Sequence, residues 1–241
     1  MVAKERATFI EKIKKQRSDI VFELPERGMK DEVIMKRMRR EGEASEKMVK
    51  RGQLSGGVYI SDREHWDLIC EVMRQHVFAN PIHIDDFAFC CQLESEVIRM
   101  TINLYKGNMA CAGLITSGGT ESIFTATYAY RENGKKERGI HNGNVIACET
   151  AHVGIDKSCH YLGLELRKIK RNAEGNFNLE AARKAIDSNT LFIYGSSPEY
   201  AFGNYDPLEK IGQLCLKYGI GLHNDCCLGS FVNPFIEQSG Y

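Results

Sequence analysis

The second half of this 241-residue sequence alternates short apolar runs with stretches of helical periodicity. Short apolar runs are typical of buried strands, and the amphipathic stretches between them are typical of helices packed on a sheet. Repeated strand–helix–strand units predict an α/β fold with a mostly parallel sheet between helices. The predicted strands are 145–148, 164–169, 191–194 and 220–225, and the predicted helices are 153–162, 179–186 capped by Asn178, and 208–218 closed by Gly219.

The first half of the chain has a different pattern. Residues 1–52 are dense in charge, with apolar residues near helical spacing, which predicts helices on a solvated surface. A loop follows, and helices are predicted at 64–78 and 93–105. We expect three segments: a charged helical segment at 1–52, a loop-and-helix segment at 53–108, and an α/β domain at 109–241.

Charge and cysteine content exclude several classes of protein. Lys plus Arg and Asp plus Glu are 32 each, so no general attraction to nucleic acid or anionic membrane is expected. Nine cysteines without a CxxC spacing indicate reduced thiols in a cytosol-facing protein, and no metal site is expected. No run approaches the roughly 18 apolar residues that a membrane helix needs, so none is expected in this chain.

A glycine turn lies directly before a helix-like run at 123–130. Gly118 and Gly119 allow close backbone approach, Ser117 and Thr120 offer hydroxyl donors, and the start of the helix presents free N–H groups. Such a turn can hold a phosphate at the positive end of the helix dipole. A plain capped turn explains the same residues, so the motif needs context.

Polar groups follow the predicted strands, where a parallel sheet would bring them to one edge. His152 comes just after one strand, although a solvated loop histidine explains it as well. His223 and Asp225 share one face of the last strand because side chains alternate. A carboxylate in an apolar strand is costly unless a cation meets it, which makes a functional role for Asp225 the preferred interpretation.

These groups together suit pyridoxal 5'-phosphate. The glycine turn can hold the phosphate, His152 can stack on the ring, and Asp225 can keep the ring nitrogen protonated. That proton makes the ring an electron sink. A Rossmann-type nucleotide binder is a weaker alternative, since neither GxGxxG nor GxxxxGK[ST] occurs.

Several motifs also carry a family resemblance. The runs 116–122 and 222–229, Ala151-His152, and Ser197-Pro198 with Gly203 and Asp206-Pro207 resemble the pyridoxal-phosphate group II decarboxylase family. Within it, the loop 55–59 and Asn80-Pro81-x-His83-x-Asp85 resemble the sphingosine-1-phosphate lyases. The resemblance implies an incomplete type I pyridoxal-phosphate-dependent transferase-like fold with a helical N-terminal arm.

The resemblance also implies an activity and a set of site residues. It implies an aldehyde-lyase of sphingolipid metabolism that cleaves phosphorylated sphingoid base to a long-chain aldehyde and phosphoethanolamine. It further implies a homodimer, with the segment 53–108 on the dimer and active-site side, and a location at the endoplasmic reticulum. The implied catalytic residues are His152, His223 and Asp225; the cofactor-binding residues are Ser117, Gly118, Gly119, Thr120, His152, Ser197, His223 and Asp225; and the substrate-side residues are Tyr59, Asn80 and His83.

The chain also departs from the family pattern. The family's Schiff-base lysine lies a few tens of residues beyond the aspartate, whereas this sequence ends 16 positions after Asp225. We therefore expect these 241 residues alone to be inactive or nearly so. Asn224 replaces the usual valine and Cys226 the usual alanine, which makes the pocket more polar. The alternatives are an amino-acid carboxy-lyase and a non-catalytic family fragment or dimer partner.

Overall fold

The computed structural model describes residues 8–9, 11–13, 21, 23–54, 57–58 and 62–240. Tyr59 lies outside these residues. Internal contacts divide the chain into two compact units, Met1–Phe78 and Ala79–Tyr241. The division into three segments that the sequence suggests stays a prediction.

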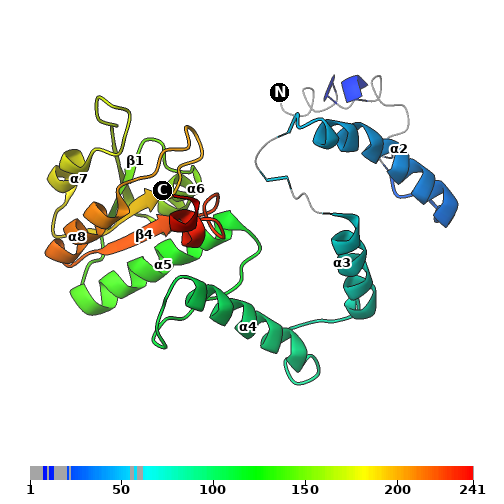
Figure 1. Cartoon of the computed structure of the whole chain (residues 1–241), viewed down its shortest axis with the longest axis horizontal. Coiled ribbons are helices and arrows are strands. Elements are labelled where there is room, and N and C mark those ends of the chain that lie inside the picture. Colours follow the sequence, from blue (N-terminus) through cyan, green and yellow to red (C-terminus); the bar gives the residue numbers. More distant parts are fainter. Residues whose placement is uncertain are drawn as a thin grey trace. The chain divides into compact units, whose positions relative to one another are not determined.

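The first unit contains two described long helices, α2 (Asp31–Lys50) and α3 (Arg63–His76) (Figure 1). The Asp62 side chain caps α3 by accepting a hydrogen bond from the backbone N–H of His65 at 2.8 Å. Neither helix has a buried residue within the described structure. Helices are thus present in both of the regions where the sequence predicts them, within 1–52 and near 64–78.

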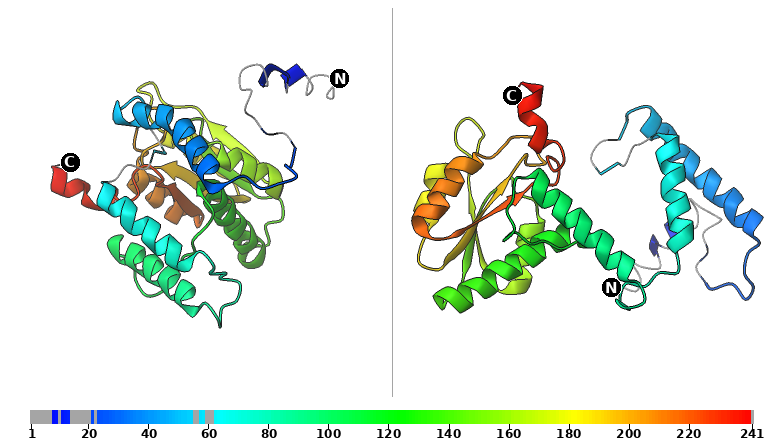
Figure 2. Two further views of the ribbon diagram at one scale, coloured as in Figure 1. Left: turned by 90° about the vertical axis from the view of Figure 1, so that its right-hand side faces the viewer. Right: turned by 60° about the horizontal axis from the view of Figure 1, so that its bottom comes forward.

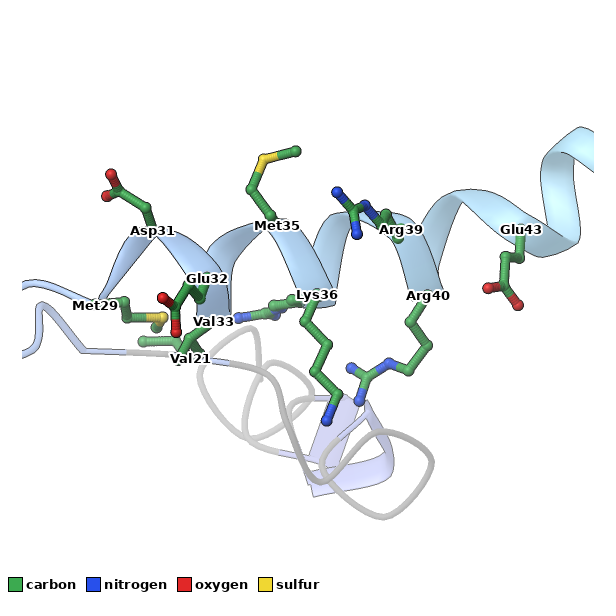
Figure 3. Close-up of a pocket in the computed structure, with 11 residues that line it drawn as sticks. Val21, Met29, Asp31, Glu32, Val33, Met35, Lys36, Arg39, Arg40 and Glu43 are labelled. Carbon is green, nitrogen blue, oxygen red and sulfur yellow. The ribbon is translucent and has the colours of Figure 1, made fainter.

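An open groove of about 1010 Å³ runs along α2. Its lining mixes apolar side chains such as Met29 and Val33 with basic and acidic ones, and Lys36 and Arg40 point to the same side of the helix (Figure 3). None of the predicted site residues that the structure describes lines it. The groove is therefore not the site that the sequence motifs indicate.

The second unit is built on a four-stranded parallel sheet with the order β2-β1-β3-β4. The strands β1 (Asn144–Cys148) and β3 (Thr190–Ser196) are fully buried, whereas β2 (Glu165–Ile169) and β4 (Gly221–Asp225) lie at the edges and are more exposed. All four predicted strands are present, so the predicted parallel α/β fold is confirmed.

Helices cover both faces of this sheet (Figures 1 and 2). One core joins β1 and β3 to α5 (Gly119–Arg138) and α6 (Gly154–Leu162). A second core joins the opposite face to α7 (Leu179–Ala185) and α8 (Leu208–Tyr218). Side-chain alternation along each strand supplies both cores.

The predicted helix signals in this domain are confirmed. The Asn178 side chain accepts from the backbone N–H of Ala181 at 2.9 Å and so caps α7. Gly219 ends α8 in the left-handed conformation, with φ 63°. The structure extends α5 beyond the apolar run 123–130, because its polar second half continues the same helix with ion pairs such as Lys135–Glu132 at 3.0 Å.

Two further elements complete the second unit. The helix α4 (Ala88–Leu104) begins five residues before the predicted start at Leu93. Its N-cap, Phe87, makes no side-chain capping hydrogen bond, so no sequence signal marked this start. A 3₁₀ helix, η1 (Asn233–Ser239), follows β4. Among the described residues, no helix combines the length and apolar character needed to cross a bilayer.

Gly229 in the loop after β4 leads to a prediction about stability. A Cβ added there would overlap the main-chain oxygen of Ser197 and the side-chain amide of Asn233. Because a backbone oxygen cannot rotate away, Gly229→Ala should lower the free energy of unfolding by about 1–3 kcal/mol, measured by urea denaturation.

Gly212→Ala is the matched control for this substitution. Its added Cβ would make only an ordinary contact, 3.7 Å from a methyl group of Leu222, inside helix α8. Alanine is the better helix former, so no loss of stability is expected. Equal unfolding midpoints for the two variants would contradict this account of the loop after β4.

Candidate cofactor site

A cavity of about 640 Å³ opens at the carboxyl edge of the sheet. It lies where the start of α5, the loop after β1 and the end of β4 meet, as a parallel sheet requires. The structure thus brings together five of the predicted site residues. The cavity is lined by Tyr105, Gly119, Thr120, Ser122, Ile123, His152, His223, Asn224, Asp225, Cys226, Cys227 and Ser230.

The start of α5 faces the cavity with backbone donors. The first intrahelical hydrogen bond of α5 runs from the backbone N–H of Ser122 to the Gly118 oxygen at 3.1 Å. The N–H groups of Gly119 and Thr120 come before it, so helix geometry leaves them without an intrahelical acceptor. A Cβ added at Gly118 or Gly119 would meet no atom within 4 Å. The turn therefore offers open space next to backbone donors at the positive end of the helix dipole.

Side chains around this turn hold it in place. The Glu121 carboxylate accepts from the backbone N–H of Ser117 at 2.6 Å, and hydrogen bonding to Ser117 lowers the pKa of Glu121. The hydroxyl groups of Thr116 and Ser122 lie 2.6 Å apart. These two bonds tie the residues before the helix to its first turn, so the backbone donors are fixed before any ligand arrives.

His152 is fixed by its own loop. Its Nδ1 accepts from the backbone N–H of Gly154 at 3.0 Å, and its ring packs edge-on against Tyr200 with 5.5 Å between ring centroids. Because Nδ1 is an acceptor, a neutral imidazole carries its proton on Nε2. The ring plane and tautomer of His152 are therefore set by the chain itself.

The end of β4 provides a histidine and a carboxylate on one face. Burial lowers the pKa of His223, and the nearby charge of Asp225 opposes that shift less strongly, so His223 is neutral at pH 7. Asp225 accepts from the Tyr194 hydroxyl at 2.5 Å through Oδ2 and from the Cys227 N–H at 3.1 Å through Oδ1. Asp225 is the one carboxylate among the described residues that line the cavity.

The other predicted site residues are not in this lining, and two of them, Ser117 and Gly118, belong to the turn before α5. Ser197 is 2% exposed at the end of β3, and its hydroxyl is hydrogen-bonded to the Asn224 side chain at 2.9–3.0 Å. Asn80 and His83 are exposed in the loop before α4, where the Asn80 side chain accepts from the N–H of Ile82 at 3.3 Å. Tyr59 falls on residues that the structure does not describe. The roles of all the predicted site residues, inside and outside this lining, stay predictions.

Reasoning from the sequence missed part of the cavity wall. The Tyr105 hydroxyl donates to the Ser230 carbonyl and lies 3.4 Å from the Cys226 sulfur. Burial raises the pKa of Tyr105 above its ordinary value, so the phenol remains a donor. These contacts join the end of α4 to the loop after β4, more than 100 residues away, and no local pattern announces them.

The loop between β3 and α8 is held by buried carboxylates and yields a prediction about pH. Asp206 is 8% exposed, and its Oδ2 accepts from the Ser196 N–H at 2.8 Å. Burial raises the pKa of Asp206 to about 6. The hydrogen bond from the Ser196 N–H opposes this shift, and the nearby charge of Glu199 adds to it. Between pH 4 and 6 the folded state therefore binds more protons at this site than the unfolded state does.

The contribution of Asp206 to the free energy of unfolding should fall as the pH rises from 4 to 6. In Asp206→Asn the amide oxygen can still accept from Ser196 but cannot ionise. The free energy of unfolding of the variant, relative to that of the parent chain, should therefore rise from pH 4 to pH 7 by up to about 3 kcal/mol. Urea unfolding at several pH values measures this difference, and a difference independent of pH would contradict the assignment.

Comparisons with known proteins show which family this chain resembles. Residues 58–239 match the family model described as the pyridoxal-dependent decarboxylase conserved domain. The chain is 34% identical over 243 residues to a sphingosine-1-phosphate lyase of Drosophila melanogaster, covering 100% of this chain and 45% of that protein. It is 37% identical over 237 residues to a sphingosine-1-phosphate lyase of Arabidopsis thaliana, covering 95% of this chain and 42% of that protein.

Solved structures show the same relationship. A sphingosine-1-phosphate lyase of Burkholderia pseudomallei matches with a TM-score of 0.87 and 29% identity, over 95% of this chain and 54% of that one. A glutamate decarboxylase of Lactobacillus brevis, at 18% identity and a TM-score of 0.68, shares the fold over 93% of this chain and 53% of that one. The chain thus spans less than half the length of the curated relatives above. On the extent of the family match, the chain belongs to the pyridoxal-dependent decarboxylase family.

Proposed function

We propose that this chain forms the cofactor-binding part of a pyridoxal-phosphate-dependent aldehyde-lyase. Its substrate would be a phosphorylated sphingoid base such as sphingosine 1-phosphate, cleaved to a long-chain aldehyde and phosphoethanolamine. The observation that carries the proposal is the cavity in which the start of α5, His152 and Asp225 meet. The lyase relatives support the choice of substrate.

The cavity fits the cofactor in both charge and space. Open space at Gly118 and Gly119 and the backbone N–H groups of Gly119 and Thr120 would receive the phosphate. The cavity lining includes no lysine or arginine among the described residues, so the helix start itself would supply the positive field there. At the other end, the Asp225 carboxylate would accept the ring N–H, and His152 would pack on the ring.

These roles define what the chain contributes to catalysis. Pyridoxal phosphate, when bound, supplies an electron sink for the carbanion left by bond cleavage. Asp225 would hold the proton on the ring nitrogen, which keeps that sink effective. His152 and neutral His223 would exclude water from the ring and offer ring nitrogens as proton donor or acceptor near it.

The remaining expectations of the family are part of the proposal. Tyr59, Asn80 and His83 would act on the substrate side. Because α4 exposes large apolar residues such as Leu93, Val97 and Met100, a homodimer that covers this helix stays the expected assembly. Association with the endoplasmic reticulum stays a prediction as well. No lysine lines the described cavity, so these 241 residues alone would bind cofactor without turnover.

A chimera tests the proposed activity. Residues 58–239 would replace the matching segment of the Drosophila lyase, which supplies the rest of the enzyme. The proposal expects long-chain aldehyde from phosphorylated sphingoid base, and none from an Asp225→Asn chimera that retains its fold. Carbon dioxide released from an amino acid would favour a carboxy-lyase instead. A folded, cofactor-loaded chimera that cleaves neither substrate would contradict the lyase proposal.

A further inference from the structure

Tyr194 is a polar side chain at the centre of the sheet, in a run whose sequence predicts only an apolar strand. It lies on β3, is fully buried, and stands on the sheet face covered by α5 and α6. In the β3–β4 register it pairs with His223, and its ring is tilted against that imidazole at 5.1 Å between centroids. Its phenol therefore extends beneath the floor of the cofactor cavity.

The Tyr194 hydroxyl has one partner there, the Asp225 carboxylate at 2.5 Å. Burial raises the pKa of Tyr194 well above its ordinary value, and the bond to Asp225 adds to the shift. The phenol thus keeps its proton and remains a donor at neutral pH. A hydrogen bond from a buried donor to a charged acceptor is among the stronger ones in a folded protein.

This bond matters because Asp225 is the last residue of an edge strand. A side chain at that place has free rotamers unless other groups hold it. Tyr194 engages one carboxylate oxygen and the Cys227 N–H engages the other, which leaves the remaining lone pairs for a ligand in the cavity.

We propose that Tyr194 is a positioning residue, which holds the Asp225 carboxylate in the orientation that receives a protonated ring nitrogen from the cavity side. The inference rests on the proposed cofactor site. Tyr194 itself contacts neither cofactor nor substrate and acts through Asp225. Its effect is therefore specific to ligands that carry the ring nitrogen.

Two probes and two variants test this specificity in the full 241-residue chain. The probes are pyridoxal 5'-phosphate and its 1-deaza analogue, in which a C–H group replaces the ring nitrogen. Tyr194→Phe removes only the hydroxyl and keeps the buried ring. Tyr130→Phe is the matched control. The Tyr130 hydroxyl also donates to β4, but to the Leu222 carbonyl at 2.7 Å and not to Asp225. Dissociation constants come from equilibrium dialysis, and circular dichroism checks the fold of each variant.

We expect the parent chain to prefer pyridoxal 5'-phosphate over the deaza analogue. Tyr194→Phe should weaken binding of pyridoxal 5'-phosphate about tenfold and leave binding of the analogue unchanged. Tyr130→Phe should change neither constant. If folded Tyr194→Phe keeps the parent's full preference for pyridoxal 5'-phosphate over the analogue, the inference about Tyr194 is overturned but the proposed function is not. If Tyr194→Phe binds both probes more weakly by the same factor, the role of Tyr194 is structural, and the inference is overturned too.

The parent chain separates these results from a failure of the proposed function. If it binds both probes equally, or neither, the role of Asp225 toward the ring nitrogen is wrong, and the inference about Tyr194 is overturned with it. If Tyr194→Phe does not fold, Tyr194 is a core residue first, and the positioning role is rejected in favour of a structural one.

Discussion

Asp225→Asn is expected to weaken binding of pyridoxal 5'-phosphate on the order of 100-fold. The substitution keeps the size of the side chain, and the amide oxygen can still accept from the Tyr194 hydroxyl. It removes the negative charge that a protonated ring nitrogen needs as its partner in this cavity. Equilibrium dialysis of the purified chain measures the change.

Asp206→Asn is the matched control for this result. It is also an Asp-to-Asn change near a strand end, but Asp206 is buried and does not line the cavity. Its affinity for the cofactor should equal that of the parent chain at pH 7. Equal loss of affinity in both variants would mean that the loss in Asp225→Asn does not come from the missing partner of the ring nitrogen.

Gly119→Val should produce a comparable loss at the other end of the cofactor. A Cβ at Gly119 meets no atom within 4 Å, so a side chain there starts in open space, and the valine methyl groups are expected to occupy the helix start. Binding of pyridoxal 5'-phosphate should weaken on the order of 100-fold, because the phosphate loses contact with the backbone N–H groups. Gly119→Ala should show a smaller loss.

Pyridoxal without its phosphate separates phosphate binding from general disruption. Its weaker binding should be nearly the same in the parent chain and in Gly119→Val, since the ring half of the cavity is untouched. If Gly119→Val bound pyridoxal 5'-phosphate as well as the parent chain does, the start of α5 would not be the phosphate site.

The fold was predictable because its signals are local. Apolar strands, the cap at Asn178 and the closing Gly219 are each read within a few residues, and together they predict the parallel sheet. The parallel sheet in turn places the end of β4 and the loop after β1 at the same edge of the sheet. That is why the sequence predicts His152 and Asp225 at one site.

Other parts of the site depend on contacts between distant residues. Tyr194 resembles any apolar strand residue in the sequence, and its bond to Asp225 exists only through the register that pairs Ser196 with Asp225. Tyr105 reaches the loop after β4 across 125 residues. The sequence indicates which groups reach the edge of the sheet, but not which of them bond to one another.

Titration of the purified 241-residue chain with pyridoxal 5'-phosphate tests the central claim most directly. Equilibrium dialysis measures affinity and stoichiometry, and borohydride reduction with intact mass detects adducts on surface lysines. The account predicts saturable binding of one cofactor per chain, tighter than for pyridoxal and lost in Asp225→Asn. Labelling of surface lysines that does not saturate and is the same in Asp225→Asn would contradict it.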